Sequence, residues 1–223
     1  MGQLVLVQGP QQPVVSIDEA KAQIHVDTAG DDLRIASLIM AATQRYDGAR
    51  GVLGRALMMQ TWQVQLSDWP AAFIDIPLPP LIRVTSIKYL DGNGDEQTLS
   101  SSLYRVVNAG ENRQSRIIRA VNQTWPSVIV GEPDAVRVTF DCGYVDDQSP
   151  SNNAVPEPIR QAIILLAQEW YDRGPQNDIP PAVQALMAPF KLSRLGGDQY
   201  QIEDELISVA QVGTDPLEAF FRR

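Results

Sequence analysis

The feature that most constrains the fold of this chain is a hydrophobic period that changes from helical to alternating and then back to helical. Up to about residue 53, and again from about residue 156, apolar residues recur at the spacing of one helix face. Between Gln60 and Phe140 they instead alternate with polar residues, as in half-buried strands. This order predicts an α+β fold: a helical bundle of four main helices with an inserted small antiparallel β domain and an extended C-terminal tail.

Helix bounds follow from the apolar stripes and from residues that start or stop helices. Ser16 is a candidate N-cap, and Pro181 is favourable as a first helical residue. A proline at position 189 must follow the end of the last helix. The helices are predicted over about residues 17–24, 31–53, 156–173 and 181–188.

Three glycines fall three residues apart near the end of the second predicted helix, at Gly48, Gly51 and Gly54. Each interior glycine costs about 1 kcal/mol of helix propensity relative to alanine. One explanation is a fraying last turn that Gly54 caps. The other is a close approach by a neighbouring element or subunit, which makes Gly48 and Gly51 candidate subunit-contact residues.

Short strands fill the β block. Trp62, Val64 and Leu66 alternate with polar residues and are predicted to face inward. The run from Asp91 to Asp95 has turn residues and predicts a hairpin. Strands are predicted over residues 60–66, 74–76, 82–90, 96–99, 104–107, 116–120 and 135–140. The first fifteen residues are predicted as an extended arm, and residues 146–155 as a loop.

Charge and cysteine content exclude several classes of function. Eighteen basic residues against 27 acidic ones give a net charge of −9, which disfavours a protein that holds DNA by neutralising phosphates. One cysteine allows no internal disulfide, and one cysteine with one histidine excludes the common zinc sites. Without a long apolar run or a signal-peptide start, the sequence predicts a soluble protein of a reducing compartment, with no membrane contact.

Candidate catalytic residues are few. His25 lies at the end of a short predicted helix, where a solvated role is usual. Cys142 follows a predicted buried strand, which favours a packed side chain over a reactive thiolate. The sequence has no phosphate-binding loop, dinucleotide fingerprint, nucleophile elbow or zinc-protease motif. We therefore expect no enzyme activity, catalytic residue, metal or cofactor.

The domain organisation follows the changes of period. Residues 1–58 are expected to hold the N-terminal arm and the first bundle helices, 59–145 the β domain, 146–190 the helices that complete the bundle, and 191–223 an acidic tail. The tail ends in apolar residues followed by two arginines. Leu217, Phe220, Phe221, Arg222 and Arg223 are the candidate partner-binding residues, because aromatic side chains are favoured anchors. The alternative is that both phenylalanines fold back onto their own domain.

Several segments, taken in order, resemble phage head–tail connector proteins of the phiE125 gp8-like family. The similarity covers about residues 10–192, and its order and spacing are more specific than any one piece. The matching segments are 15–21 (VSIDEAK), 54–57 (GRAL), 60–62 (QTW), 77–81 (PLPPL), 84–91 (VTSIKYLD), 104–106 (YRV), 136–140 (VRVTF), 143–144 (GY) and 155–163 (VPEPIRQAI).

The resemblance implies an adaptor of the virion neck, built on a helical bundle with an inserted β domain. Such adaptors bind below the portal protein as a ring, usually of twelve subunits, and carry the next connector, a stopper or a tail-completion protein. DNA passes through the ring at genome ejection without specific binding, which agrees with an acidic chain. The implied location is the virion, with the host cytoplasm during assembly.

Two other functions are compatible with the sequence. A β-sandwich module on a helical support that binds glycan or protein would need Trp62, Trp69 and Trp125 exposed on one surface. A hydrolase would need a concave site around Cys142 or around paired acids.

Overall fold

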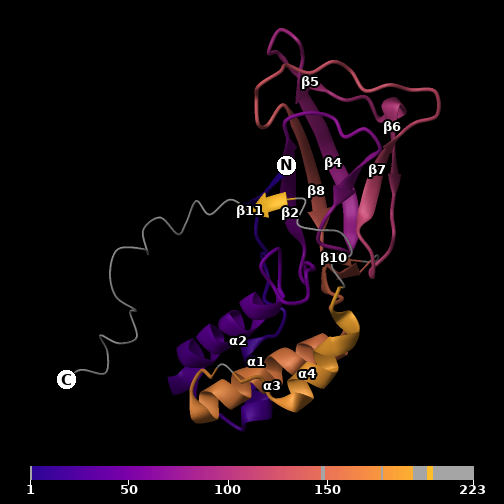
Figure 1. Cartoon of the computed structure of the whole chain (residues 1–223). Helices are drawn as coiled ribbons and strands as arrows, with labels where there is room; N and C mark the ends of the chain where they lie inside the picture. The colour runs from indigo at the N-terminus through magenta and orange to yellow at the C-terminus, as the bar shows by residue number, and fades with distance from the viewer. Residues whose placement is uncertain (1, 147–148, 177, 193–199, 203–223) are drawn as a thin grey trace.

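The computed structural model describes residues 2–146, 149–176, 178–192 and 200–202 and has a helical part and a β part (Figure 1). The fold is α+β, as the change of period predicts. The helices of the described chain are α1 (Ile17–Ile24), α2 (Asp32–Tyr46), α3 (Glu157–Arg173) and α4 (Pro181–Met187). The strands are β1 (Gly2–Gln8), β2 (Gln60–Leu66), β3 (Phe73–Ile76), β4 (Leu81–Leu90), β5 (Glu96–Thr98), β6 (Tyr104–Val107), β7 (Ser115–Arg119), β8 (Val136–Cys142), β9 (Val145–Asp146), β10 (Ser149–Asn153) and β11 (Tyr200–Ile202).

Helix α3 is the centre of the helical part and packs against α1, α2 and α4. Ile159, Ile163, Leu166 and Trp170 recur at helical spacing and are all buried. Helix α1 begins at the predicted N-cap: the Ser16 hydroxyl accepts a hydrogen bond from the Glu19 amide, and the Glu19 carboxylate accepts one from the Ser16 amide. The positions of α1, α3 and α4 agree with the sequence patterns.

Helix α2 is shorter than predicted, because it ends at Tyr46 and not near residue 53. Asp47 has an extended backbone, and Gly48 adopts a positive φ of 74°, which favours glycine. The chain then folds back, so that the Gly48 amide donates to the Arg55 carbonyl at 2.8 Å. The apolar residues after Tyr46 match the helical spacing only by coincidence. Leu53, for example, lies in a turn and not in a helix, and its side chain is buried there.

Two sheets of the β part pack face to face. The larger sheet has the order β11-β1-β2-β8-β4-β5, and the smaller has the order β3-β7-β6. Val64 on β2 lies opposite Val138 on β8, which in turn lies opposite Ile87 on β4. These three side chains share one buried cluster with Ile74 and Ile117 of the smaller sheet. The alternation of β2 therefore predicts the buried face correctly.

Three segments expected outside the sheets are paired strands. The predicted N-terminal arm supplies β1, which is antiparallel to β2, with Leu4 opposite Val64. Strand β11 lies parallel to β1 at residues 2–4. Strands β9 and β10 pair where the sequence predicts a loop over residues 146–155, with β9 beginning one residue earlier. Local patterns carry little information about such pairing, which depends on the partner strand.

Candidate functional site

Among the residues that the structure describes, those with catalytic potential show no catalytic arrangement. His25 is exposed and caps the end of α1 in a left-handed conformation. Cys142 is 0% exposed, and burial raises the pKa of its thiol well above the ordinary value. Within the described ranges, no group of three or more His, Cys, Asp or Glu side chains is placed to hold a metal ion. The described residues thus offer neither an activated nucleophile nor a metal centre.

The junction between the helical and β parts is organised around Asp47, directly after α2. Its carboxylate accepts a hydrogen bond from the Leu57 amide at 2.7 Å and from the Gln60 side-chain amide at 2.9 and 2.7 Å. The side-chain oxygen Oε1 of Gln60 in turn accepts a hydrogen bond from the indole N–H of Trp62 at 2.9 Å. A continuous polar chain therefore links the end of α2 to the core of the larger sheet.

Burial raises the pKa of Asp47 to about 6, although the hydrogen bonds from Leu57, Gln60 and Gly48 act in the opposite direction. Desolvation is the larger effect, because the half-buried carboxylate has lost much of its contact with water. The sequence gives little sign of this role, since a carboxylate after a helix is usually solvated.

A second contact across the junction involves a buried arginine. Arg55 is 1% exposed, and its Nη1 donates to the hydroxyl of Tyr144 at 2.5 Å and to the carbonyl of Glu111 at 3.3 Å. Its Nε has no hydrogen-bond partner in the described part of the chain. Burying a guanidinium costs free energy unless its donors are satisfied, so the Tyr144 contact stabilises the junction.

Glycines allow close backbone contacts at the same junction. A Cβ on Gly143 would lie 2.3 Å from the carbonyl oxygen of Met58, and the residue has a φ of 120°. A Cβ on Gly51 would lie 2.4 Å from the carbonyl of Tyr46. Both distances are shorter than atoms tolerate, so only glycine fits these positions.

The candidate subunit-contact residues Gly48 and Gly51 are therefore used within the chain. Both are buried, and the helix face on which the sequence places them does not form. The close-approach explanation applies to Gly51 through its own chain. A contact of these glycines with another subunit stays a prediction.

The candidate partner-binding residues Leu217, Phe220, Phe221, Arg222 and Arg223 lie outside the described residues. The same holds for most of the predicted acidic tail. The role of these five side chains thus stays a prediction from sequence.

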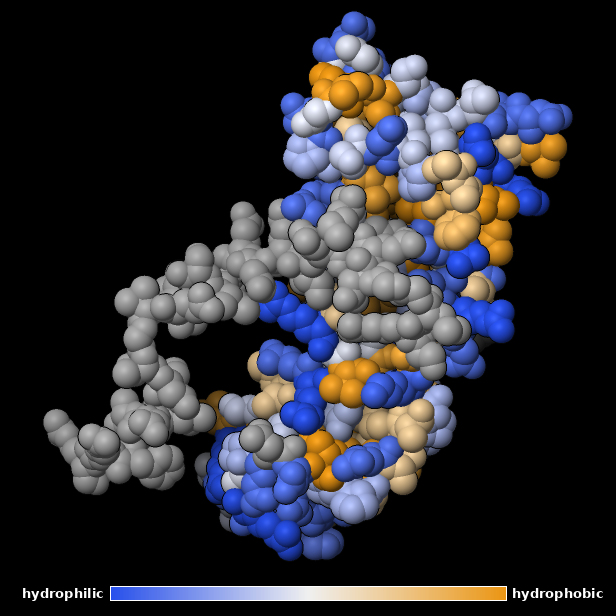
Figure 2. All heavy atoms as spheres, in the orientation of Figure 1, coloured by the Kyte–Doolittle hydropathy of each residue, from blue (hydrophilic) through white to orange (hydrophobic). Residues whose placement is uncertain are grey.

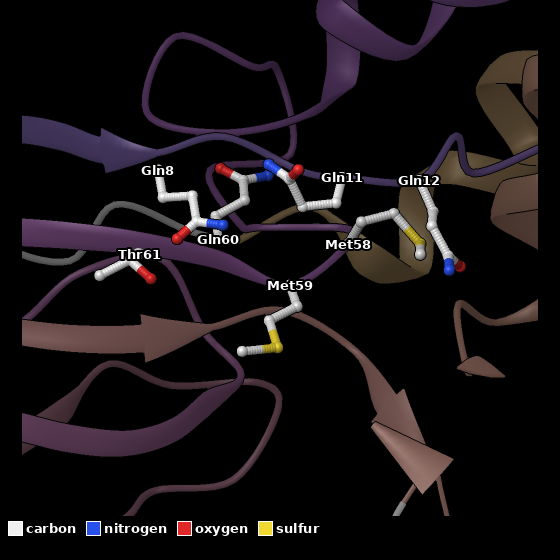
Figure 3. A pocket seen from close by; sticks show the side chains of 7 residues that line it. All are labelled: Gln8, Gln11, Gln12, Met58, Met59, Gln60 and Thr61. Atoms are coloured by element: carbon white, nitrogen blue, oxygen red, sulfur yellow. The ribbon is translucent and has the colours of Figure 1, made fainter. Parts of the chain in front are cut away.

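A pocket of about 280 Å³ opens at the junction (Figure 3). Its walls come from two segments, the end of β1 with the residues that follow and the start of β2 with the residues that precede it. The lining residues are Gln8, Gln11, Gln12, Met58, Met59, Gln60 and Thr61. None of these side chains is a strong acid, base or nucleophile.

The three tryptophans that a glycan-binding surface would need do not share one exposed surface. Trp62 is 6% exposed and belongs to the β core. Trp69 and Trp125 stack on each other at 4.7 Å, and both rings are half-buried. The stacked pair contributes to the core of the β part.

Exposed apolar side chains mark the remaining candidate surfaces. On the face shown in Figure 2, hydrophobic residues form separate small groups between hydrophilic ones. The most exposed apolar side chains include Leu33 and Met40 on α2, Val7 on β1, and Val121 and Val130 between β7 and β8. Of the helices described, none is long and apolar enough to cross a membrane. Exposed apolar side chains scattered in this way are normal on a protein surface.

Comparisons with known proteins show the fold. No protein-family model and no curated protein sequence matches the chain. A chain from the neck of an empty gene transfer agent particle, computed with C6 symmetry, is 22% identical with a TM-score of 0.69, over 87% of this chain and 98% of that chain.

Two further structures are similar. A chain from the virion of the native gene transfer agent particle is 23% identical with a TM-score of 0.67, over 87% of this chain and 97% of that chain. A chain from the neck of the native particle, computed with C12 symmetry, is 22% identical with a TM-score of 0.64, over 87% and 98%. The fold of this chain is thus shared over nearly the full length of these particle proteins.

Proposed function

We propose that this chain is a structural protein of the neck of a phage-like particle. The observation that carries the proposal is the fold match, which spans nearly the whole length of chains from gene transfer agent particles, two of them from necks. Fold alone does not fix function, but the described residues add no competing catalytic site. A role through association with other chains agrees with both observations.

More specifically, the chain acts as a head–tail adaptor of the phiE125 gp8-like family. It forms a ring below the portal protein, a dodecamer, and carries the next connector, stopper or tail-completion protein. The C6 and C12 symmetries of the similar neck structures support a ring. In this proposal, residues 1–58 with 146–190 form the bundle and residues 59–145 the inserted β domain. Strand β1, from the expected N-terminal arm, pairs with β2 and so belongs to the sheet of the β domain.

The net charge of −9 suits a ring through which DNA passes. Proteins that bind DNA tightly do so by neutralising phosphates with Lys and Arg. An acidic wall repels the duplex, so the genome slides through at ejection. The location that goes with this proposal is the virion neck, with the host cytoplasm during assembly.

A direct test removes the chain from particles. Particles assembled with a stop codon early in the reading frame should contain heads without attached tails when viewed by electron microscopy. Restoring the intact chain in trans should restore complete particles. Complete and infectious particles without the chain would refute the proposal.

The tail is proposed to anchor the adaptor to the portal or to an adjacent subunit through Leu217, Phe220 and Phe221. Truncation should be placed after Ile202, because Leu192 donates a backbone hydrogen bond to Leu53 and β11 pairs with β1. The truncated chain should keep its thermal stability and lose capture by immobilised portal. A Ser208→Ala chain of full length is the control, and undiminished capture of the truncated chain would exclude this role.

A further inference from the structure

The outer face of the smaller sheet combines arginines with apolar side chains. The strand register places Arg105 of β6 opposite Ile118 of β7, and Ile118 opposite Phe73 of β3. Arg116 of β7 lies on the same face, since its guanidinium stacks over the Phe73 ring at 4.1 Å from the ring centroid. The other face of this sheet, which includes Ile117, is buried in the β core. We call the outward set the arginine face: Arg105, Val107, Arg116, Ile118 and Phe73.

The arginine face is open to solvent in the described part of the chain. Val107 is 44% exposed, the Arg116 side chain is 52% exposed, and Arg105 is exposed as well. Arg116 pairs with Asp75 at 2.9 Å, whereas the guanidinium of Arg105 has no hydrogen bond or ion pair with a described residue. Arginine and aromatic side chains are enriched where proteins bind each other. The face therefore has the composition of a docking surface.

This face lies in a strongly basic stretch of an acidic chain. Residues 105–119 hold four arginines and one acid, Glu111, although the whole chain has a net charge of −9. Asp75 balances one of the four arginines, Arg116. The remaining positive charge favours a partner of opposite charge.

One segment of the sequence matches both properties of the arginine face. Glu203, Asp204 and Glu205 are the only three consecutive residues of the chain with charge of one sign, and Leu206 and Ile207 follow directly. The carboxylates suit the arginines, and the two apolar residues suit the apolar members of the face. The backbone of a DNA duplex would match the charge alone. We call residues 203–207 the acidic segment.

The acidic segment begins on the other side of the β part. It follows β11, which ends the larger sheet, and Figure 1 shows β11 and β6 on opposite sides. The smaller sheet lies near β4, because the Asn108 side chain after β6 donates to the Leu81 carbonyl at 3.2 Å.

The distance across the β part decides which copy supplies the segment. Strand β4 is the fourth strand from β11, or about 19 Å away, and the smaller sheet is a further layer of about 10 Å. A chain of three residues reaches at most about 11 Å beyond Ile202. The carboxylates of a chain therefore fall short of the arginine face of the same chain, and those of another copy are available to it.

We infer that the arginine face of one copy binds the acidic segment of the next copy. This inference rests on the proposed function, because it assigns a subunit contact within the proposed ring. A ring closed by rotation joins two different surfaces of neighbouring copies, and these two surfaces lie on opposite sides of the β part. Copies with a net charge of −9 repel each other, so a local attraction between opposite charges selects this contact.

Cross-linking tests which copies are joined. A chain with Val107→Cys and Ser208→Cys keeps every charge of the arginine face and of the acidic segment. It is assembled into particles, treated with a short bismaleimide and separated on a denaturing gel. The native Cys142 is buried with a raised thiol pKa and does not compete. The contact predicts a ladder of multimers, whereas each single variant gives at most a dimer.

A matched control, Arg173→Cys with Ser208→Cys, moves the first thiol to an exposed position at the end of α3 and should give no ladder. Particles that carry the Val107→Cys, Ser208→Cys chain at the neck without a ladder would overturn the inference and leave the proposed function intact. If the neck holds no such chain, the same treatment of the concentrated purified chain decides the contact: a ladder supports it and its absence overturns it. Absence of the unaltered chain from the neck refutes the proposed function separately.

A charge reversal gives an independent measure and identifies the partner. Arg105→Glu should lower incorporation into particles at least about tenfold, because like charges then meet across the contact. Arg173→Glu, the same change at the end of α3, should incorporate normally. Adding Asp204→Lys to Arg105→Glu should recover most of the loss, which it would not do if the arginine face bound DNA phosphates. Normal incorporation of Arg105→Glu, or a loss that Asp204→Lys leaves unchanged, would contradict the inference.

Discussion

Replacing Asp47 with asparagine should change how the stability of the protein depends on pH. Asp47 joins α2 to Leu57 and to Gln60 through its carboxylate, and burial raises its pKa to about 6 from an ordinary value of 3.8. The side chain introduced by Asp47→Asn keeps one oxygen that accepts the Leu57 hydrogen bond but does not titrate. Its amide nitrogen cannot accept the hydrogen bond from Gln60, but that loss does not depend on pH. The pH dependence of the difference between the two chains therefore comes from one ionisation.

The sign follows from proton binding in the two states. Between pH 3.8 and about 6 the folded protein holds a proton on Asp47 that the unfolded chain has released. Unfolding then releases a proton, so the free energy of unfolding falls as pH rises. The contribution is fully present below pH 3.8 and is lost as pH rises through about 6.

The magnitude follows from the size of the shift. A rise of about two pKa units corresponds to about 3 kcal/mol, because each unit is worth about 1.4 kcal/mol. Hydrogen bonds lower the pKa of Glu19, Asp91 and Glu96, and these groups change stability in the opposite direction. The useful quantity is thus the difference between the two chains, in which the other groups cancel.

The assay is urea unfolding of both chains at intervals from about pH 4 to about pH 8. The free energy of unfolding of the unaltered chain minus that of Asp47→Asn should fall by about 2 to 3 kcal/mol over this range. An Asp95→Asn chain, changed at an exposed carboxyl of the β4–β5 turn, should show no such fall. A difference that stays constant, or that rises with pH, would refute the account of Asp47 as a buried carboxyl.

Two substitutions and one labelling experiment further test the junction. In denaturant unfolding, Gly143→Ala should lower the free energy of unfolding by at least about 2 kcal/mol, because the new Cβ would meet a backbone carbonyl at 2.3 Å. The control is Gly92→Ala, where the Cβ has open space and the free energy of unfolding should change by less than about 0.5 kcal/mol. Tyr144→Phe should cost about 1 to 3 kcal/mol in the same assay, since the buried Arg55 loses its shortest hydrogen bond; an unchanged midpoint would contradict this. Cys142 in the native protein should react with iodoacetamide at least about a hundredfold more slowly than in urea, and fast native alkylation would show that the thiol is accessible.

Local patterns in the sequence predict the elements whose form depends on nearby residues. Ser16 and Glu19 form a capping box at the predicted helix start, and Trp62 and Val64 face the core as their alternation requires. The hairpin between β4 and β5 closes where Asp91 accepts hydrogen bonds from the amides of Asn93 and Asp95. In each case the determining pattern involves residues a few positions apart.

The sequence does not predict interactions between distant segments. The pattern places the end of α2 too late, because the apolar residues after Tyr46 keep the helical spacing. In the structure the helix ends at Tyr46, because Gly48 has a positive φ and its amide donates back to the Arg55 carbonyl. Strand β1 depends on pairing with β2, which lies far along the chain. In the candidate site, the spacing of Gly48 and Gly51 indicates that the backbone there is unusual. Which residues that backbone contacts depends on the fold and cannot be predicted from the spacing.

The junction explains how an inserted β domain is held on a helical bundle. The inserted block leaves the bundle between Tyr46 and Gln60 and returns to it after Cys142. These two crossings lie together, since Leu57 and Tyr144 are hydrogen-bonded. There the Asp47 hydrogen bonds hold the first crossing, and the amide of Tyr144 donates to the carbonyl of Leu57 at 2.9 Å and so ties the second crossing to the first. An insertion fixed at both ends by adjacent contacts is oriented by them. In the proposed ring, these contacts would therefore hold every β domain at the same angle to its own bundle.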